Sequence, residues 1–329
     1  MAIIRLNKQN YFHNLNECLK RVETINKLII VLKNNAYGHG YLEISSLAKE
    51  FGIKYIAVKN AFEANILKDE FENILILSQL PQYYTSEKNY IIAINDLCYF
   101  DYLKQGDKIA LKLDTNMHRS GITQDNLEYA IKIIKDKKLN LTSAFTHYSS
   151  MQNIKKQKPL YIKMCEFIQD NFSDEIFFHS SNSSTLFLGE NDYDKAARIG
   201  IAQFGYCDAN ANLKPVLSLY ANKISSRQIN KGDSIGYDET FVSNRNLEIA
   251  NYDLGYADGM LYYKGIGEIF LADDKSPILG KISMDSFSTY NLNDEICVFN
   301  DAVKFAKYFN TNAYECLVRL SCNIKKEIV

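Results

Sequence analysis

Lys33 stands where covalent chemistry with a carbonyl compound becomes possible. It ends the apolar run Leu28–Leu32, which predicts a buried strand, and it precedes a loop that contains Tyr37, Gly38 and Gly40. Partial burial lowers the pKa of a lysine amine, and the uncharged amine is the form that makes a Schiff base. The glycines allow the loop backbone to approach a ligand closely. Taken alone, a lysine at a strand end can also be a surface residue with a buried stem.

Three further polar residues, His147, His179 and Arg198, stand at or near the ends of later apolar runs. With Lys33 they follow the first, sixth, seventh and eighth of eight candidate strands. The carboxyl ends of the strands of a (β/α)8 barrel meet at one rim, where such barrels bind ligands. Strands alternating with helical segments would also fit a doubly wound sheet, but four polar groups at equivalent positions favour the barrel. The candidate strands are Leu28–Leu32, Tyr55–Val58, Ile74–Ser78, Tyr90–Ile94, Ile109–Asp114, Leu141–His147, Glu175–His179 and Ala196–Gly200, and the helical segments between them include Ala61–Phe71, Gln124–Lys137 and Leu160–Asp170.

The sequence changes character after Pro215, where short β-like runs replace the alternation of strands and helices. The fold predicted is therefore α/β: an N-terminal (β/α)8 TIM barrel, residues 7–215, followed by a mostly β domain, residues 216–329. Residues 1–6 look strand-like and are candidates to pair with the second domain. At 329 residues the chain is long enough for both parts. The β-like runs include Ser234–Tyr237, Glu248–Leu254 and Pro277–Phe287, and one short helix is expected at Asp301–Phe309.

The composition argues against several classes of function. A net charge of −1 and a pI near 6.5 do not suit a nucleic-acid or anionic membrane surface. No apolar run approaches the ~18 residues that span a bilayer, and residues 1–10 lack the apolar core of a signal peptide. The seven cysteines are odd in number and include no CxxC pair, which is typical of free thiols in a reducing compartment. We expect a cytoplasmic protein without a nucleic-acid partner, a membrane partner or a metal site.

The run from Lys33 to Gly40 reads Lys-Asn-Asn-Ala-Tyr-Gly-His-Gly and resembles the cofactor-lysine motif of alanine racemases. Members of that family carry a lysine, two variable residues and then Ala-Tyr-Gly-His-Gly. The resemblance implies that Lys33 binds pyridoxal 5'-phosphate (PLP) covalently and that Tyr37 contacts the PLP phosphate. Further motifs in the family order extend the resemblance to about Glu315.

Two segments near the sixth and seventh strands resemble sequence motifs that surround PLP in the family. Thr146–Tyr148 is similar to a THF segment, and His179–Ser183 is similar to an HxxNS segment. Phosphate sites near the seventh and eighth strands are common in this fold. The PLP-binding residues that the resemblance implies here are His147, Asn182 and Ser183, with the backbone amides of Gly200 and Ile201 at the phosphate.

Arg198 lies at the position where the family places an arginine beside the pyridine nitrogen of PLP. Many other PLP enzymes have a carboxylate there, which protonates the ring and strengthens it as an electron sink. A guanidinium donates a hydrogen bond but hardly gives up its proton. The resemblance therefore implies an unprotonated ring and little transamination.

The segment Leu111–Gly121 resembles the family's LK-x-DTGMxRLG segment on the fifth strand. In many members the lysine matching Lys112 is carbamylated, and its negative charge holds the arginine matching Arg119 beside cofactor and substrate. Asn116 replaces a glycine and Ser120 replaces a leucine, but asparagine tolerates a left-handed turn. The alternative is a structural cluster of Lys112, Asp114 and Arg119 without carbamylation.

Three motifs after Pro215 resemble the family's C-terminal domain. Tyr237 occupies the place of the second catalytic base, although Asp238 stands where a glycine is usual. Gly255–Gly259 matches the GYADG motif, and Ser283–Asp285 matches the SMD motif. The substrate-site residues that the resemblance implies are Arg119, Tyr256, Met284 and Asp285. The tail from Ser321 lacks the family's RVPR run.

The resemblance implies a PLP-dependent racemase that interconverts L- and D-alanine by two bases and so supplies D-alanine for bacterial cell walls. Lys33 would serve the D-alanine proton and Tyr237 the L-alanine proton. In the family each site is shared between two subunits, so a homodimer is implied. A broad-spectrum or serine racemase stays an alternative. A fold-related PLP-dependent amino-acid decarboxylase should carry a carboxylate in place of Arg198, and a non-catalytic PLP carrier should lack the β domain.

Overall fold

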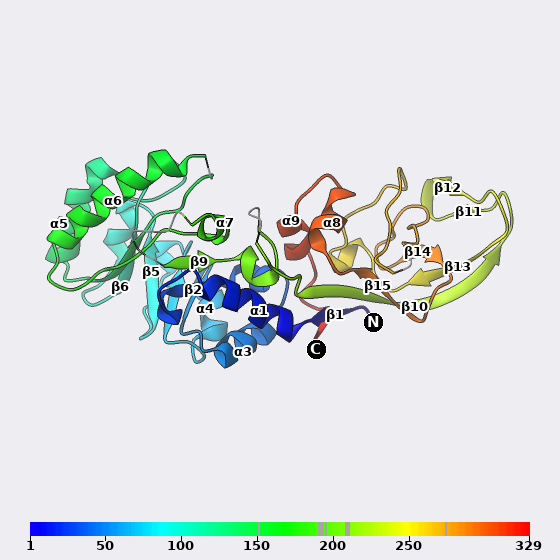
Figure 1. Ribbon diagram of the computed structural model, residues 1–329, viewed down its shortest axis with the longest axis horizontal. Coiled ribbons are helices and arrows are strands. Elements are labelled where there is room, and N and C mark those ends of the chain that lie inside the picture. The colour runs from blue at the N-terminus through cyan, green and yellow to red at the C-terminus, as the bar shows by residue number, and fades with distance from the viewer. Residues whose placement is uncertain (151, 190–193, 195, 208–210, 274) are drawn as a thin grey trace.

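Eight parallel strands form one sheet in the first lobe of the computed structural model, as the sequence predicts (Figure 1). The structure describes residues 1–150, 152–189, 194, 196–207, 211–273 and 275–329. The sheet order is β8-β7-β6-β5-β4-β3-β2-β9, and a parallel bridge between Ser181 and Ala197 brings its two edges together into a nearly closed barrel. The strands are β2 (Leu28–Val31), β3 (Tyr55–Val58), β4 (Asn73–Ile76), β5 (Tyr90–Ile94), β6 (Lys108–Lys112), β7 (Asn140–Phe145), β8 (Phe177–His179) and β9 (Ala197–Ile199).

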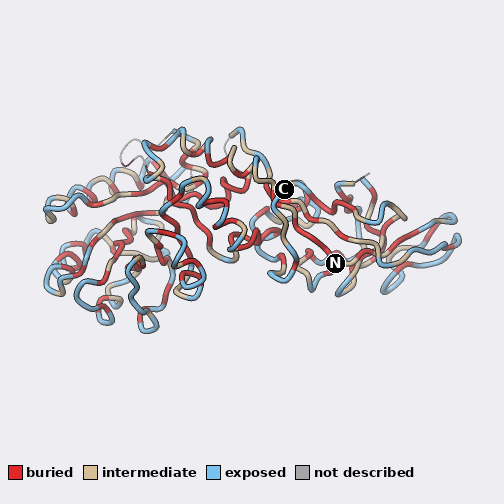
Figure 2. Tube along the Cα trace, turned by 90° about the horizontal axis from the view of Figure 1, so that it is seen from below, coloured by how far each residue is buried: buried red, intermediate tan, exposed pale blue. Residues whose placement is uncertain are grey.

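The strands of the barrel are apolar on both faces because helices cover the outside while side chains fill the inside. Every residue of β2 and β3 is buried, and buried segments concentrate within each lobe (Figure 2). The helices of this lobe are α1 (Lys8–Leu19), α2 (Lys33–Tyr37), α3 (Tyr41–Phe51), α4 (Ala61–Leu67), α5 (Leu127–Asp136), α6 (Ile154–Asp170) and α7 (Ser183–Phe187), with the 3-10 helices η1 (Ile25–Lys27), η2 (Pro81–Tyr83), η3 (Leu97–Tyr102), η4 (Gln124–Asn126) and η5 (Ile201–Phe204).

Two helix boundaries differ from the sequence prediction. Helix α6 begins at Ile154 rather than at Leu160, and Pro159 lies inside it. Its first turns are held by the buried side chain of Ile154 and by Gln157, whose amide oxygen accepts from the Ser149 amide at 3.0 Å. Burial and side-chain bonding therefore outweigh the backbone hydrogen bond that a proline cannot make. Helix α4 ends at Leu67, four residues before the predicted end at Phe71.

The second lobe is a mostly antiparallel sheet that includes the first strand of the chain. β1 (Ile3–Leu6) pairs antiparallel with β10 and parallel with β16, so both chain termini lie close together between the lobes (Figure 1). The sheet order is β14-β13-β10-β1-β16, with β15 also on β10. Its other elements are β10 (Leu217–Ile229), β13 (Leu247–Tyr252), β14 (Phe287–Tyr290), β15 (Glu295–Phe299), β16 (Lys325–Ile328), the hairpin of β11 (Ser234–Ile235) and β12 (Phe241–Val242), the helices α8 (Ala302–Lys307) and α9 (Ala313–Val318), and the 3-10 helices η6 (Tyr237–Glu239) and η7 (Tyr256–Asp258).

The prediction of a β run over Pro277–Phe287 is wrong for most of its length. Apart from a bridge between Phe270 and Pro277, the segment is irregular until β14 begins at Phe287. Gly280 explains part of this, since its φ of 73° breaks an extended strand and a side chain there would clash with the Ile235 carbonyl. The strand predicted over Ser234–Tyr237 is only two residues long, and helix α9 was not predicted.

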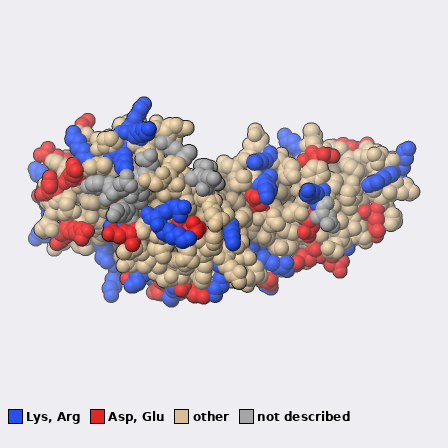
Figure 3. Space-filling model, viewed as in Figure 1, with Lys and Arg blue, Asp and Glu red and all other residues tan. Residues whose placement is uncertain are grey.

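The surface shows no large field of one sign on the face drawn in Figure 3, where basic and acidic side chains are interspersed. Within the described ranges, no helix is both long enough and apolar enough to cross a bilayer.

Candidate active site

Lys33 is separated from the end of β2 by Leu32 alone and lies half-buried at the carboxyl rim of the barrel. Burial lowers the pKa of its amine, and the nearby Arg119 guanidinium lowers it further, while Glu63 acts in the opposite direction. Both lowering effects favour the uncharged, nucleophilic amine. The environment predicted for Lys33 from the sequence is therefore the one that the fold provides.

A left-handed turn follows Lys33. Asn34, Asn35, Ala36 and Tyr37 have φ values of 54°, 54°, 49° and 56°. Such a conformation costs L-residues about 1–2 kcal/mol each, so four in succession must be held by the surrounding structure. The turn directs Tyr37 toward the eighth strand, where a side chain on Gly200 would clash with the Tyr37 hydroxyl. The turn therefore connects Lys33 with the part of the site near Gly200.

A small polar cradle lies beside Tyr37. The Ser183 hydroxyl accepts hydrogen bonds from the amides of Gly200 at 3.0 Å and Ala202 at 3.2 Å. The missing side chain at Gly200 leaves the backbone accessible there. Ile201, whose amide the resemblance assigns to the phosphate with that of Gly200, begins the 3-10 helix η5 between these two donors. Asn182 mainly caps helix α7, with its Oδ1 accepting from the amides of Ser184 and Thr185, both at 3.1 Å.

Arg198 is buried and rigidly oriented. Its Nη1 donates to the His179 carbonyl at 2.7 Å and contacts His179 Nδ1, and its Nη2 donates to the Thr146 carbonyl. The guanidinium carbon lies 4.8 Å from the ring centroid of Phe145, which in turn stacks on the His179 ring at 4.9 Å. Burial lowers the pKa of Arg198 to about 10, so the group stays charged at neutral pH. The barrel thus presents a fixed cationic donor in the site.

Lys112 lies inside the barrel with polar neighbours rather than a counter-ion. Its Nζ hydrogen-bonds to the Ser120 hydroxyl and, at 3.3 Å, to Asn95 Oδ1. Burial, followed by the charge of Arg119, lowers its pKa to about 8. The alternative cluster of Lys112, Asp114 and Arg119 is not formed as ion pairs, because Asp114 accepts from the amides of the loop that follows it.

The loop after β6 confirms the expectation for Asn116. Its φ is 71°, so it takes the left-handed conformation that the glycine it replaces would allow. Asp238, the other residue that stands at a glycine position, also has a positive φ of 58° and pairs with Lys281. Both residues therefore take the left-handed conformation that a glycine allows.

These groups line one cavity of about 520 Å³ at the barrel rim, a size suited to a cofactor with a small substrate. No carboxylate side chain is found among its described lining residues, whereas five side chains are basic. Such a cavity attracts anions. The residues predicted from the sequence that line it are Lys33, Tyr37, Lys112, Arg119, His147, Asn182, Ser183, Arg198 and Gly200.

His147 is expected to stay uncharged between pH 5 and 8. Burial, followed by the positive charges of Arg198 and Arg119, lowers its pKa to about 3. Because this folded value lies below the ordinary value, the stability that neutral His147 contributes is complete above about pH 6.5 and is lost as the pH falls toward 3.

An NMR titration of the imidazole protons should show no shift for His147 between pH 5 and 8. The resonance is assigned with His147→Gln, and the urea-unfolded protein supplies a control that titrates near its ordinary value. A midpoint above pH 5 in the folded protein would contradict this environment.

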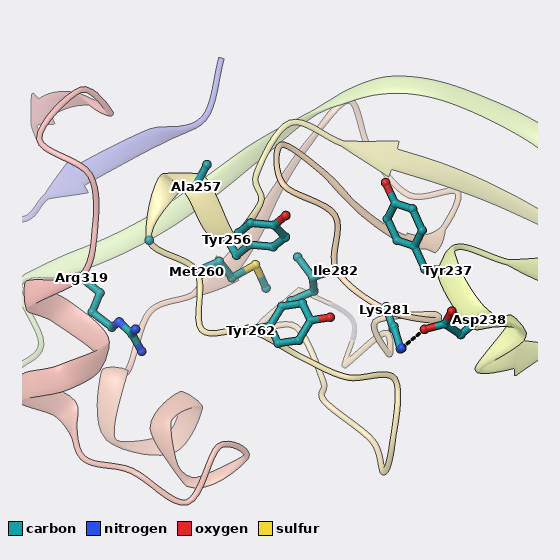
Figure 4. Close-up of a pocket in the computed structure, with 10 residues that line it drawn as sticks. Tyr237, Asp238, Tyr256, Ala257, Met260, Tyr262, Lys281, Ile282 and Arg319 are labelled. Atoms are coloured by element: carbon teal, nitrogen blue, oxygen red, sulfur yellow. Dashed lines mark hydrogen bonds and ion pairs between the residues drawn. The ribbon is translucent and has the colours of Figure 1, made fainter.

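Tyr237 and Tyr256 do not reach this cavity within one chain. They line a separate hollow of about 710 Å³ in the second lobe, together with Tyr262, Lys281 and Arg319. Figure 4 shows Tyr237 on one side of this hollow and Tyr256 with Tyr262 on the other. Tyr237 is 63% exposed, which is unusual for a residue predicted to hold a catalytic proton.

The GYADG and SMD loops pack on each other beside this hollow. The Ala257 amide donates to the Met284 carbonyl at 3.0 Å, and the Tyr256 amide donates to the Ser283 carbonyl at 3.2 Å. A side chain on Gly255 would clash with Met284. Met284 itself is 53% exposed, so the two loops present Tyr256 and Met284 at the surface, next to Asp285.

Several residues of the barrel cavity were not predicted. Tyr314 reaches it from helix α9, with its ring 5.9 Å from that of Tyr37. The segment Asn312–Glu315, which resembles an NYE segment of the family, could have pointed to it. Lys59 and Ser78 follow β3 and β4 and could have been found from their strand-end positions. Asn95, which accepts from Lys112 Nζ at 3.3 Å, directly follows β5 and could have been found from the same signal, although it does not line the cavity.

The sequence matches two family models along nearly its whole length. Residues 6–208 match the model described as "Alanine racemase, N-terminal domain", and residues 216–328 match "Alanine racemase, C-terminal domain". The chain is 44% identical over 333 residues to an alanine racemase of Campylobacter jejuni subsp. doylei, with 100% of both chains covered. It is 36% identical over 341 residues to one of Nitratiruptor sp., with 99% of both covered.

Solved structures share the fold. The alanine racemase of Bacillus anthracis with bound L-Ala-P superposes with a TM-score of 0.90 at 23% identity, covering 100% of this chain and 95% of the other. That of Clostridium difficile 630 gives a TM-score of 0.89 at 21% identity with the same coverage. The barrel and the β lobe thus occur together in these structures.

Proposed function

Because the chain belongs to the alanine racemase family, we propose that it interconverts L- and D-alanine with PLP bound through Lys33. The observation that carries the proposal is one cavity in which Lys33, Arg198 and the Ser183 cradle meet without a carboxylate among the described lining residues. That absence disfavours the decarboxylase alternative, which calls for an acid at the ring nitrogen. Residues 7–215 would bind the cofactor, and residues 216–329 would supply the second base.

The residues of the barrel cavity fit PLP. The hydroxyls of Tyr37 and Ser183 and the amides of Gly200 and Ile201 would hold the phosphate, since a side chain at Gly200 would fill the space beside Tyr37. Asn182 and His147 line the same cavity and would contact the cofactor. Arg198 would donate to the ring nitrogen. When bound through an imine, PLP withdraws electrons from the bond to the α-hydrogen of the substrate.

The chain's own residues would handle two protons. Lys33 Nζ, whose pKa burial lowers, would hold the proton exchanged with D-alanine, and Tyr237 Oη would hold the one exchanged with L-alanine. His147, which is neutral at pH 7 because burial lowers its pKa to about 3, lines the same cavity as Arg198. Arg119, the Met284 amide, Tyr256 and Asp285 would bind the substrate or shape its entrance.

We propose a homodimer in which Tyr237, Tyr256 and Met284 of one subunit complete the cavity of the other. The support is their separation from Lys33 within one chain and their exposure: 63% for Tyr237 and 53% for Met284. A catalytic tyrosine needs a closed environment, which a partner subunit would supply.

Carbamylation of Lys112 is a further part of this proposal. Its pKa of about 8 leaves a fraction of uncharged amine at neutral pH, and this amine can add to CO2, giving a carbamate and releasing one proton. The carbamate would attract the Arg119 guanidinium, which the lysine ammonium repels.

Within the described residues no two cysteines form a disulfide, which supports a reducing cytoplasm. The product D-alanine would serve cell-wall synthesis. The test is an assay of the purified PLP-loaded protein with L-alanine, L-serine and other L-amino acids, which follows D-product and CO2. Rapid formation of D-alanine alone is expected. Equal rates with serine would indicate a broad-spectrum racemase, and CO2 release would indicate a decarboxylase.

Arg198→Glu is expected to slow racemisation at least about 100-fold, because a carboxylate would protonate the pyridine ring and divert the reaction. Pyruvate, the transamination by-product of alanine, should appear with a new long-wavelength absorption band. A coupled pyruvate assay and the visible spectrum measure both effects. Arg198→Lys, which keeps the positive charge, is the control and should form no more pyruvate than wild type. Normal racemisation by Arg198→Glu without pyruvate would place the guanidinium away from the ring.

A further inference from the structure

Glu63 is a buried carboxylate that no catalytic step uses. It lies in the first turn of α4 and is 5% exposed, close to the barrel rim. Asn60 caps the same helix, and its Oδ1 accepts from the Glu63 amide at 3.1 Å. A glutamate at this position ordinarily reaches back to the amide of the capping residue. Its burial calls for hydrogen-bond partners, because an isolated buried charge is costly.

The carboxylate of Glu63 instead bonds to the amide of the residue before that cap and to an amide in the loop after β2. Its Oε1 accepts from the Asn34 amide at 2.9 Å, and its Oε2 accepts from the Lys59 amide at 2.7 Å. Hydrogen bonds to an ionised acceptor are among the stronger ones in proteins. One side chain therefore ties together the segments that follow β2 and β3.

The bond to Asn34 falls at a sensitive position. Asn34 follows Lys33 directly and is the first of the four left-handed residues that lead to Tyr37. The left-handed turn is costly by itself, so an external acceptor at its first amide favours it over right-handed or extended alternatives. Rotation of the Asn34 backbone would turn the Lys33 side chain and move Tyr37 away from Gly200.

We propose that Glu63 is a positioning residue: by bonding the amides of Asn34 and Lys59 it holds the left-handed turn and fixes the direction of Lys33. It touches neither substrate nor cofactor. The inference deepens the proposed function and rests on it only for the role of Lys33.

The test compares Glu63→Ala and Glu63→Gln with Asn60→Ala in the full-length protein as purified. Asn60→Ala weakens the same helix by removing its cap but leaves both carboxylate bonds in place. Hydrogen exchange is followed by mass spectrometry in the peptide that spans residues 33–38. Glu63→Ala should exchange at least about tenfold faster there than wild type, while Asn60→Ala should match wild type. Glu63→Gln, which keeps one acceptor oxygen, should lie between.

A second readout reports the orientation of the cofactor. The visible circular dichroism of the PLP band, divided by its absorbance, should fall in Glu63→Ala and Glu63→Gln but not in Asn60→Ala. Equal effects of Glu63→Ala and Asn60→Ala on both readouts would overturn the proposal, as would a wild-type result for Glu63→Ala. If Glu63→Ala does not fold, a wild-type result for Glu63→Gln overturns it. Absence of PLP from the wild-type protein would refute the proposed function alone, because the exchange measurement does not depend on the cofactor.

Discussion

Lys33→Ala is expected to purify colourless and to racemise alanine at least about 1,000-fold more slowly than wild type, because both the covalent link and one of the two bases are lost. The wild-type protein should be yellow, and borohydride should bleach its visible band and fix PLP to the peptide that contains Lys33. Peptide mass spectrometry and a D-alanine assay measure these results.

Two other lysines line the same cavity and provide matched controls. Lys59→Ala should remain yellow and keep its borohydride adduct on Lys33. Lys112 has a pKa of about 8, so its amine is also reactive, and it is the residue most able to capture PLP by mistake. Recovery of the wild-type adduct on Lys112 or Lys59 would refute the assignment of Lys33.

Co-expressed Lys33→Ala and Tyr237→Ala chains should recover about a quarter of wild-type activity, although each variant alone is nearly inactive. In a mixed dimer with shared sites, one site receives both altered residues and the other receives intact Lys33 and Tyr237. Random pairing makes about half of the dimers mixed, each with one of two sites intact, which gives the quarter. The effect is large because a background near zero rises to a measurable rate.

Differently tagged chains allow the mixed dimers to be isolated by two successive affinity steps. The isolated mixed dimers should have about half of wild-type activity per dimer. Tyr262 lines the same hollow as Tyr237, so Tyr262→Ala serves as the matched partner variant. Isolated mixed dimers of Lys33→Ala and Tyr237→Ala that stay inactive would show that both residues act within one chain, even if each proves essential.

The barrel half of the site was predictable because its residues stand at or near the ends of short apolar runs that are recognisable as strands. Lys33, His179 and Arg198 each close a short apolar run, and parallel strands in a barrel bring such ends to one rim. The residues that hold these groups were not predictable in the same way. Glu63 stands three residues after Asn60, a spacing that suggests a local helix cap, whereas its carboxylate bonds to Asn34 and Lys59.

The β half of the site was predicted less well from the residues themselves. The segment before Phe287 has the composition of a strand, but tight contacts at Gly280 and Gly255 shape it into loops. Such close approaches depend on segments distant in sequence, and no local pattern reveals them. Tyr237 is predicted through its motif, and its distance from Lys33 within one chain could not be read from sequence order.

The pairing of Ile3 with Tyr220 has a consequence for how the chain is made. β1 leaves the ribosome first, yet its neighbours β10 and β16 follow only after the whole barrel sequence. Contacts between residues so far apart form late, because the entropy lost in closing a long loop must be offset before these contacts stabilise the chain. We expect the barrel to fold while β1 is still unpaired, so the exposed backbone edge of β1 is the point at which nascent chains are most open to association with one another.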